Sequence, residues 1–162
     1  MLKKPLKKNN VLIKRGHYPY RALRSKGMKK VWLGIGGNVG DTLRRFEHLF
    51  FFFQQSGFVN ILETAPILKN PPFGYTEQED FYNSIILVET YLTPKALLRY
   101  ILKIEKRFGR KRLFKDAPRT LDIDIIFYEN QVMDSKVLKL PHPGWSKRDS
   151  VLIPLSYMKG FK

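Results

Sequence analysis

Two aspartates separated by a single residue are the most specific indication of a chemical function in the sequence. Asp122 and Asp124 lie in a β-branched stretch that is typical of a strand. Because strand side chains alternate between faces, both carboxylates would point to one side, with Ile123 and Ile125 on the other. A cation relieves their repulsion, and Mg²⁺ completed by phosphate oxygens and water fits the pair. The alternatives are an exposed face, or pairing with a neighbouring arginine.

Basic residues precede this pair. The segment 103–119 contains eight of them against only two acids, Glu105 and Asp116. The eight are Lys103, Lys106, Arg107, Arg110, Lys111, Arg112, Lys115 and Arg119. Cations that can bind phosphates, next to carboxylates that can bind a metal, are the combination that phosphoryl transfer requires.

Other candidate motifs are weaker. The glycines of 34–41 miss the dinucleotide-binding spacing, and no P-loop Lys follows them, so we interpret this stretch as a tight strand-to-helix turn. His17, His48 and His142 share no metal-binding spacing. His142, between two prolines, would either contact a phosphate or serve as a turn residue.

The net charge of +16 on this 162-residue chain is concentrated at one end. Residues 1–30 hold 11 Lys and Arg and no acid, which leaves 19 basic and 14 acidic residues in the remainder. The remainder is therefore only mildly basic, and suits a small polyanionic ligand at least as well as a nucleic acid.

The composition limits the class of protein. Hydrophobic residues make up 43% and aromatic residues 14%, enough for one domain with a sizeable core. The sequence has no cysteine, which excludes disulfides and cysteine-based zinc sites. No apolar run approaches the roughly 18 residues of a membrane-spanning helix. We expect a cytoplasmic, monomeric protein without a membrane partner.

The pattern of apolar residues predicts six main elements. Strands are expected at 31–35, 58–63, 81–91 and 120–128, and helices at 42–55 and 94–108. A long loop at 64–80 and a basic loop at 110–119 connect them. The order β-α-β-β-α-β predicts an α+β, ferredoxin-like fold, an antiparallel sheet with helices packed on one face.

Residues 1–29 show no sustained periodicity, and we interpret them as a basic, partly ordered extension of a domain at 30–162. Two short apolar segments, 11–13 and 18–20, are candidates for docking on the core. The alternatives are an arm that binds a nucleic acid or an acidic partner, or a translation start at Met28.

Several segments together resemble the 6-hydroxymethyl-7,8-dihydropterin pyrophosphokinases of folate biosynthesis. They occur in the family's order over about residues 31–158, and the run from Pro118 to Asp124 is highly specific. The others are the turn at 36–41, the loop at 70–74, the run 80–83, the basic run 109–112, Pro141-His142-Pro143, Arg148 and the segment 151–155.

The resemblance implies pyrophosphoryl transfer from ATP to the pterin hydroxymethyl group, with two Mg²⁺ ions on Asp122 and Asp124. Arg110 and Arg119 would stabilise charge on the transferred group. The expected ATP-binding residues are Glu105, Arg110, Arg112, Ile125, His142 and Arg148. The expected pterin-binding residues are Asn70, Pro71, Pro72, Phe73, Phe81 and Asn83.

The chain also departs from the family pattern. The basic loop is one residue shorter, and Asp116-Ala117 replaces a common Trp-Gly pair, so Arg112 need not act as its family counterpart does. Ser150 stands where an aromatic residue usually covers the second face of the pterin, and we expect Trp145 to supply that ring instead.

The competing interpretation is a ferredoxin-like RNA-binding protein with a basic arm. Its sheet would have to tolerate two carboxylates that repel phosphate, and no aromatic RNA-binding consensus lies on either central strand. We therefore expect small-molecule substrates and no nucleic acid.

Overall fold

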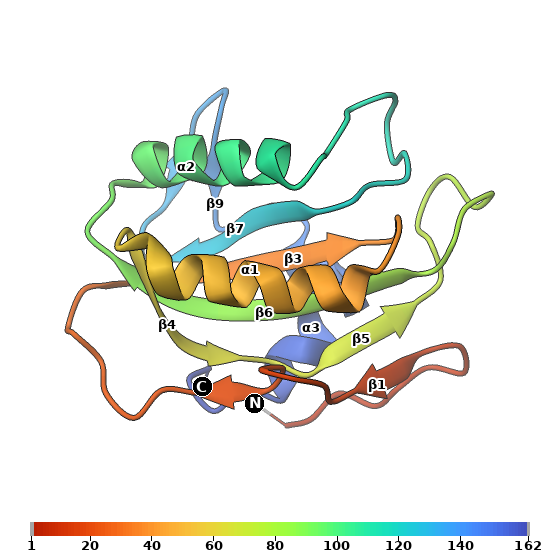
Figure 1. Ribbon diagram of the computed structural model, residues 1–162, viewed down its shortest axis with the longest axis horizontal. Helices are drawn as coiled ribbons and strands as arrows, with labels where there is room; N and C mark the ends of the chain where they lie inside the picture. The colour runs from red at the N-terminus through yellow and green to blue at the C-terminus, as the bar shows by residue number, and fades with distance from the viewer. Residues whose placement is uncertain (1, 162) are drawn as a thin grey trace.

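A seven-stranded antiparallel sheet forms the centre of the computed structural model, which describes residues 2–161 (Figure 1). Its main path runs β1-β5-β6-β3-β7, and β4 pairs with both β6 and β2. The strands are β1 Val11–Ile13, β2 Tyr20–Arg21, β3 Lys29–Gly37, β4 Val59–Thr64, β5 Ile67–Asn70, β6 Phe81–Thr90 and β7 Asp122–Tyr128. A separate hairpin joins β8 Met133–Asp134 to β9 Lys139–Leu140.

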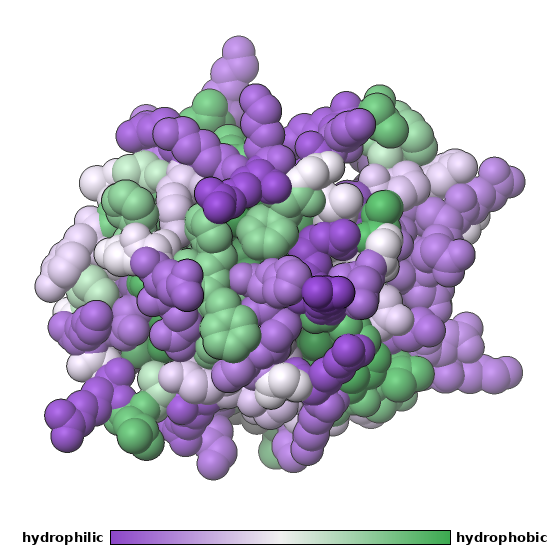
Figure 2. Space-filling view, viewed as in Figure 1, coloured by the Kyte–Doolittle hydropathy of each residue, from purple (hydrophilic) through white to green (hydrophobic). Residues whose placement is uncertain are grey.

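Helices cover both faces of the sheet. Helices α1 Thr42–Ser56 and α2 Pro94–Arg107 lie on one face, and the short α3 Asp149–Ser156 lies on the other (Figure 1). Strand β6 divides its side chains accordingly: Ile86 and Val88 join the core under α1 and α2, and Ile85 and Leu87 join the cluster that contains α3. Figure 2 shows the α1 side, where hydrophilic residues cover most of the surface.

The first helix forms where its apolar spacing predicts. Phe46, Leu49, Phe50 and Phe53 are buried on one side of α1. The Asp41 side chain accepts a hydrogen bond from the backbone N–H of Arg44 at 3.1 Å, and Gly57 ends the helix with φ of 71°.

The α+β class and the antiparallel sheet are confirmed, with three corrections. The predicted loop at 64–80 contains β5, which pairs with β6 through Leu68 and Asn83. The predicted strand at 31–35 extends to Lys29–Gly37, so Gly36 and Gly37 belong to the sheet instead of a turn. The helices do not all share one face, because α3 covers the opposite one.

The N-terminal segment contributes two strands to the same sheet. Strand β1 pairs with β5, and β2 pairs with β4. Between them Tyr18 is 1% exposed, and its hydroxyl donates to the backbone carbonyl of Phe46 at 2.8 Å. Both apolar segments therefore dock on the core, and the division at residue 29 stays a prediction. Between residues 2 and 161, no helix is long and apolar enough to span a membrane.

Candidate active site

The carboxylate pair lies on β7, opposite two glycines of β3. Asp122 pairs with Gly36 and Asp124 with Gly34, and Asn83 of β6 pairs with Gly36 from the other side. A Cβ at Gly36 would lie 2.6 Å from Asn83 Oδ1 and 2.7 Å from Asp122 Oδ1. A side chain there would collide with both, so the glycine leaves room for polar groups from two strands.

Both carboxylates point to the face of the sheet that carries α3. Ile123 and Ile125, which alternate with them, are buried in the core under α1 and α2. This agrees with the alternation expected of a strand. The α1–α2 face holds most of the core, and the α3 face carries the polar groups of the site.

Asp124 lies in an environment that is unfavourable for its charge. Burial raises the pKa of its carboxyl, and the Asp122 charge raises it further, while His142, Arg148 and Arg110 partly offset both effects. Among residues 2–161 no third His, Cys, Asp or Glu joins the pair as a metal ligand. The donor set is thus two carboxylates, which fits Mg²⁺ completed by phosphate oxygens and water.

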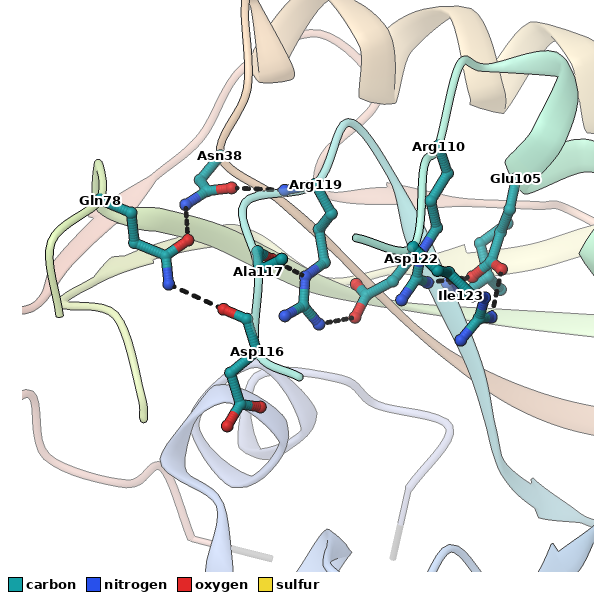
Figure 3. A network of polar contacts seen from close by, with 10 residues as sticks. Asn38, Gln78, Glu105, Arg110, Asp116, Ala117, Arg119, Asp122 and Ile123 are labelled. Carbon is teal, nitrogen blue, oxygen red and sulfur yellow. Dashed lines mark hydrogen bonds and ion pairs between the residues drawn. The ribbon is translucent and has the colours of Figure 1, made fainter. Parts of the chain in front are cut away.

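Arg119 is held beside Asp122 by contacts on several sides (Figure 3). Its Nη1 donates to Asp122 Oδ2 at 3.2 Å, and its Nε donates to the Ala117 carbonyl at 3.0 Å. The guanidinium also lies 5.2 Å from the centre of the Phe81 ring. Its position is therefore fixed without a ligand, so a phosphate would meet a preorganised cation.

A second network supports the loop that carries Arg119. The Asn38 Oδ1 accepts the Arg119 backbone N–H at 3.0 Å, and its Nδ2 donates to Gln78 Oε1 at 2.8 Å. Gln78 in turn donates to the Asp116 carbonyl at 3.0 Å (Figure 3). The two long loops are thus tied together. Sequence reasoning missed Asn38 and Gln78, because an amide in a loop carries no distinctive spacing.

Glu105 organises the basic residues at the open edge of β7. Its Oε2 accepts from the Ile123 backbone N–H at 2.7 Å and from Arg110 Nη1 at 2.8 Å. Its Oε1 accepts from Arg112 Nη2 at 3.2 Å. Burial raises the pKa of the Glu105 carboxyl, and these hydrogen bonds and cations oppose that effect. Glu105, predicted to contact a nucleotide, is therefore engaged in positioning both arginines.

Arg110 retains an unused donor. Its Nε is buried and has no hydrogen-bond partner among the described residues, although Nη1 binds Glu105. A buried N–H without an acceptor is costly, so this guanidinium is incompletely satisfied by its protein partners. The Arg112 side chain is 65% exposed, against 13% for Arg110. Both arginines pair with Glu105, but the Arg110 side chain is mostly buried and the Arg112 side chain is mostly exposed.

The larger cavity, of about 750 Å³, is lined by all six residues predicted to bind the acceptor substrate. They are Asn70, Pro71, Pro72, Phe73, Phe81 and Asn83. Asp122, Arg119 and Arg148 also line it. The Asn83 Nδ2 donates to Asn70 Oδ1 at 2.6 Å, so β5 and β6 present a linked pair of amides. Aromatic walls with a few fixed amides suit a flat polar heterocycle.

A smaller cavity, of about 280 Å³, lies along the other part of β7. Asp124, Ile125 and His142 line it, together with residues of the β8–β9 hairpin. Arg148, predicted with this group, lines the larger cavity instead. Glu105, Arg110 and Arg112 line neither.

Trp145 is the residue expected to cover the second face of the substrate. Its ring packs edge-on against Phe127 at 4.9 Å between centres, in the cluster that contains α3. Ser150 lines the larger cavity, and Trp145 does not. The structure thus places the Trp145 ring outside the lining of the larger cavity, and its role on the second face of the substrate stays a prediction.

Comparison with known proteins gives one consistent result. A family model described as 7,8-dihydro-6-hydroxymethylpterin-pyrophosphokinase matches residues 32–160. The 2-amino-4-hydroxy-6-hydroxymethyldihydropteridine pyrophosphokinase of Helicobacter pylori is 46% identical over 129 residues, covering 78% of this chain and 79% of the relative. The enzymes of that name from Campylobacter jejuni (39% over 139 residues; 85% and 88%) and Aquifex aeolicus (39% over 132 residues; 79% and 79%) are also similar.

Proposed function

The chain belongs to the 7,8-dihydro-6-hydroxymethylpterin-pyrophosphokinase family, and on that premise we propose that the two cavities and the carboxylates between them form its active site. The enzyme transfers a pyrophosphoryl group from ATP to the hydroxymethyl oxygen of 6-hydroxymethyl-7,8-dihydropterin, in folate biosynthesis.

The pterin is assigned to the larger cavity. Phe81 supplies an aromatic wall, and the linked amides of Asn70 and Asn83 supply a donor and acceptors for the edge of the heterocycle. Phe73, 81% exposed, together with Pro71 and Pro72 belongs to a loop that can close over the ring.

The nucleotide is assigned to the smaller cavity and the basic residues beside it. Ile125 lies beside Asp124 and, with its backbone, is proposed to line the adenine site. His142 of the smaller cavity and Arg148, which lines the larger cavity with Asp122, are proposed to contact phosphates. Arg110, held by Glu105 at β7, is proposed to contact a phosphate oxygen through its guanidinium. Arg112 is proposed as a weaker contact, since it is mostly exposed.

Asp122 and Asp124 are proposed to hold Mg²⁺, with two ions expected. When bound, the metal neutralises phosphate charge and orients the donor for attack. The raised pKa of the Asp124 carboxyl, caused by burial and by the Asp122 charge, supports this assignment, because a cation would remove the conflict.

The reaction forms a bond between the hydroxymethyl oxygen and the β-phosphorus. The bond from that phosphorus to the oxygen bridging the α-phosphate breaks, AMP leaves, and the hydroxyl proton passes to solvent or phosphate. Arg119 and Arg110 would stabilise the negative charge that develops on the transferred group. The observation that carries the proposal is the position of the carboxylate pair, with one member in each cavity.

Product analysis tests this function directly. The purified protein is incubated with ATP, Mg²⁺ and 6-hydroxymethyl-7,8-dihydropterin, and the nucleotide and pterin products are quantified. AMP and pterin diphosphate in equal amounts are expected. ADP would instead indicate transfer of the γ-phosphoryl group, and no turnover by folded protein would contradict the proposal.

A further inference from the structure

The N-terminal segment reaches the larger cavity. Residues 7–10 line it together with Asn70 at the end of β5 and Asp149 at the start of α3. These four residues precede the match to the family model, which begins at residue 32. The wall that they form is therefore built from outside the part of the chain that the family model matches.

Strand pairing places this turn beside the substrate residues. Strand β1 runs antiparallel to β5, with Val11 opposite Lys69. The residues just before Val11 must therefore lie beside the chain that follows Lys69, where Asn70 and Pro71 line the cavity. The turn closes on itself, since the Asn10 backbone N–H donates to the Lys7 carbonyl at 3.0 Å.

Helix α3 fixes the other end of the segment. The Lys7 ammonium forms an ion pair with Asp149, and the Lys4 backbone N–H donates to Ser156 Oγ at 2.9 Å. The segment thus bridges α3 and β5, two elements that both supply residues to the cavity. The contacts with α3 on one side and the pairing of β1 with β5 on the other hold the turn in place before any ligand binds. This lowers the entropic cost of ordering the turn when a ligand binds.

We propose that the turn of residues 7–10 is a substrate-binding wall that contributes to pterin affinity and not to nucleotide affinity. The inference rests on the proposed assignment of the pterin to the larger cavity. The smaller cavity, where the adenine is assigned, contains no residue of this segment, so binding of that part of the nucleotide is not expected to respond. Asn9 and Asn10 carry the donors and acceptors that a pterin edge requires.

One side chain of the turn is engaged by the protein, and the other three are available to a ligand. Lys7 is engaged by Asp149, whereas Lys8 forms no ion pair within residues 2–161. Asn10 is half-buried, and Asn9 and Lys8 are exposed. A ligand can therefore take hydrogen bonds from Lys8, Asn9 and Asn10 without breaking the tether at Lys7.

The test is a triple variant of the full chain, Lys8→Ala with Asn9→Ala and Asn10→Ala. The KM and the directly titrated Kd for 6-hydroxymethyl-7,8-dihydropterin should rise by about fivefold to thirtyfold, the equivalent of one or two hydrogen bonds. The KM for ATP should change by less than about twofold. Lys14→Ala, which removes one charge from the same segment away from the cavity, should match the unaltered protein.

The outcomes separate this inference from the proposed function. Unchanged pterin affinity in an active triple variant would overturn the inference alone. Failure of the unaltered protein to form AMP and pterin diphosphate would overturn the proposed function. If the variant does not fold, lysine acylation of the unaltered protein decides: bound pterin should protect Lys8 and not Lys14, and equal labelling of Lys8 with and without pterin would refute the wall.

Discussion

Asp122 and Asp124 lie on the same face of β7 but line different cavities. Asp122 belongs to the larger one, with Asn83 and Phe81, and Asp124 belongs to the smaller one, with Ile125. A group that passes from a ligand in one cavity to a ligand in the other must cross the boundary marked by this pair. Side chains at positions i and i+2 of a strand point to the same face, so Asp122 and Asp124 lie side by side there, each in a different cavity.

Removal of either carboxylate should impair turnover far more than stability. Asp122→Ala and Asp124→Ala should each lower kcat/KM by at least about 100-fold, because the phosphates lose their fixed geometry. Steady-state assays of AMP release measure this. Asp134→Ala is the control, since its side chain is 86% exposed and its one ion pair within residues 2–161 is with Lys139 at 3.8 Å. Near-normal rates in both site variants would refute the metal assignment.

Arg110 and Arg112 offer a matched comparison, since both donate to Glu105. Arg110→Ala should lower kcat by about 100-fold, because a confined cation held by Glu105 at β7 is lost. Arg112→Ala should cost less than about fivefold, as expected of an exposed ion pair. Single-turnover rates at saturating ATP distinguish them. Equal losses would mean that the basic loop closes and buries Arg112 in the complex.

Gly36 should be intolerant of even the smallest side chain. Gly36→Ala would place a methyl group against Asn83 Oδ1 and Asp122 Oδ1, and should reduce kcat/KM by about 10-fold to 100-fold by displacing both. At Gly34, on the same face of β3, the nearest atoms to an added Cβ belong to the apolar side chains of Ile126 and Ile85. Gly34→Ala, the control, should alter the melting temperature more than the rate. An active Gly36→Ala enzyme would show that neither side chain needs its present position.

The elements whose residues follow a regular local pattern could be predicted from the sequence. The apolar spacing of α1 and its stop at Gly57 follow from local periodicity, and so does the alternation that sets Asp122 apart from Ile123. The carboxylate pair and its neighbouring arginine could therefore be found from the sequence. Strand β5 could not, because four residues within a proline-punctuated stretch carry too little pattern to stand out.

Long-range contacts account for what sequence reasoning missed. Asn38 matters because β3 ends beside the loop that carries Arg119, and the Trp145 ring packs against Phe127 instead of lining the larger cavity. The two N-terminal strands, β1 and β2, are recognisable as strands only from their pairing with β5 and β4. Each of these depends on partners distant in sequence, which local propensity does not report.

Glu89 gives a pH-dependent prediction away from the active site. Burial alone would raise its pKa, but hydrogen bonds from the Ser25 hydroxyl, the Lys26 backbone N–H and the Asn60 amide outweigh burial and lower it. A lowered pKa in the folded state means that the ionised carboxylate stabilises the fold above its unfolded pKa of about 4.3. That stabilisation is lost as the pH falls through the lower folded value.

Glu89→Gln should therefore reduce the free energy of unfolding by about 1–3 kcal/mol at pH 7. The difference from the unaltered protein should shrink steadily below about pH 4.5, as the unaltered protein loses the same charge. Urea denaturation at pH 7, 5, 4 and 3 measures both. Glu77→Gln, an exposed residue, should have little effect at any pH. A constant difference at every pH would mean that the shape of the amide, and not the lost charge, causes the destabilisation.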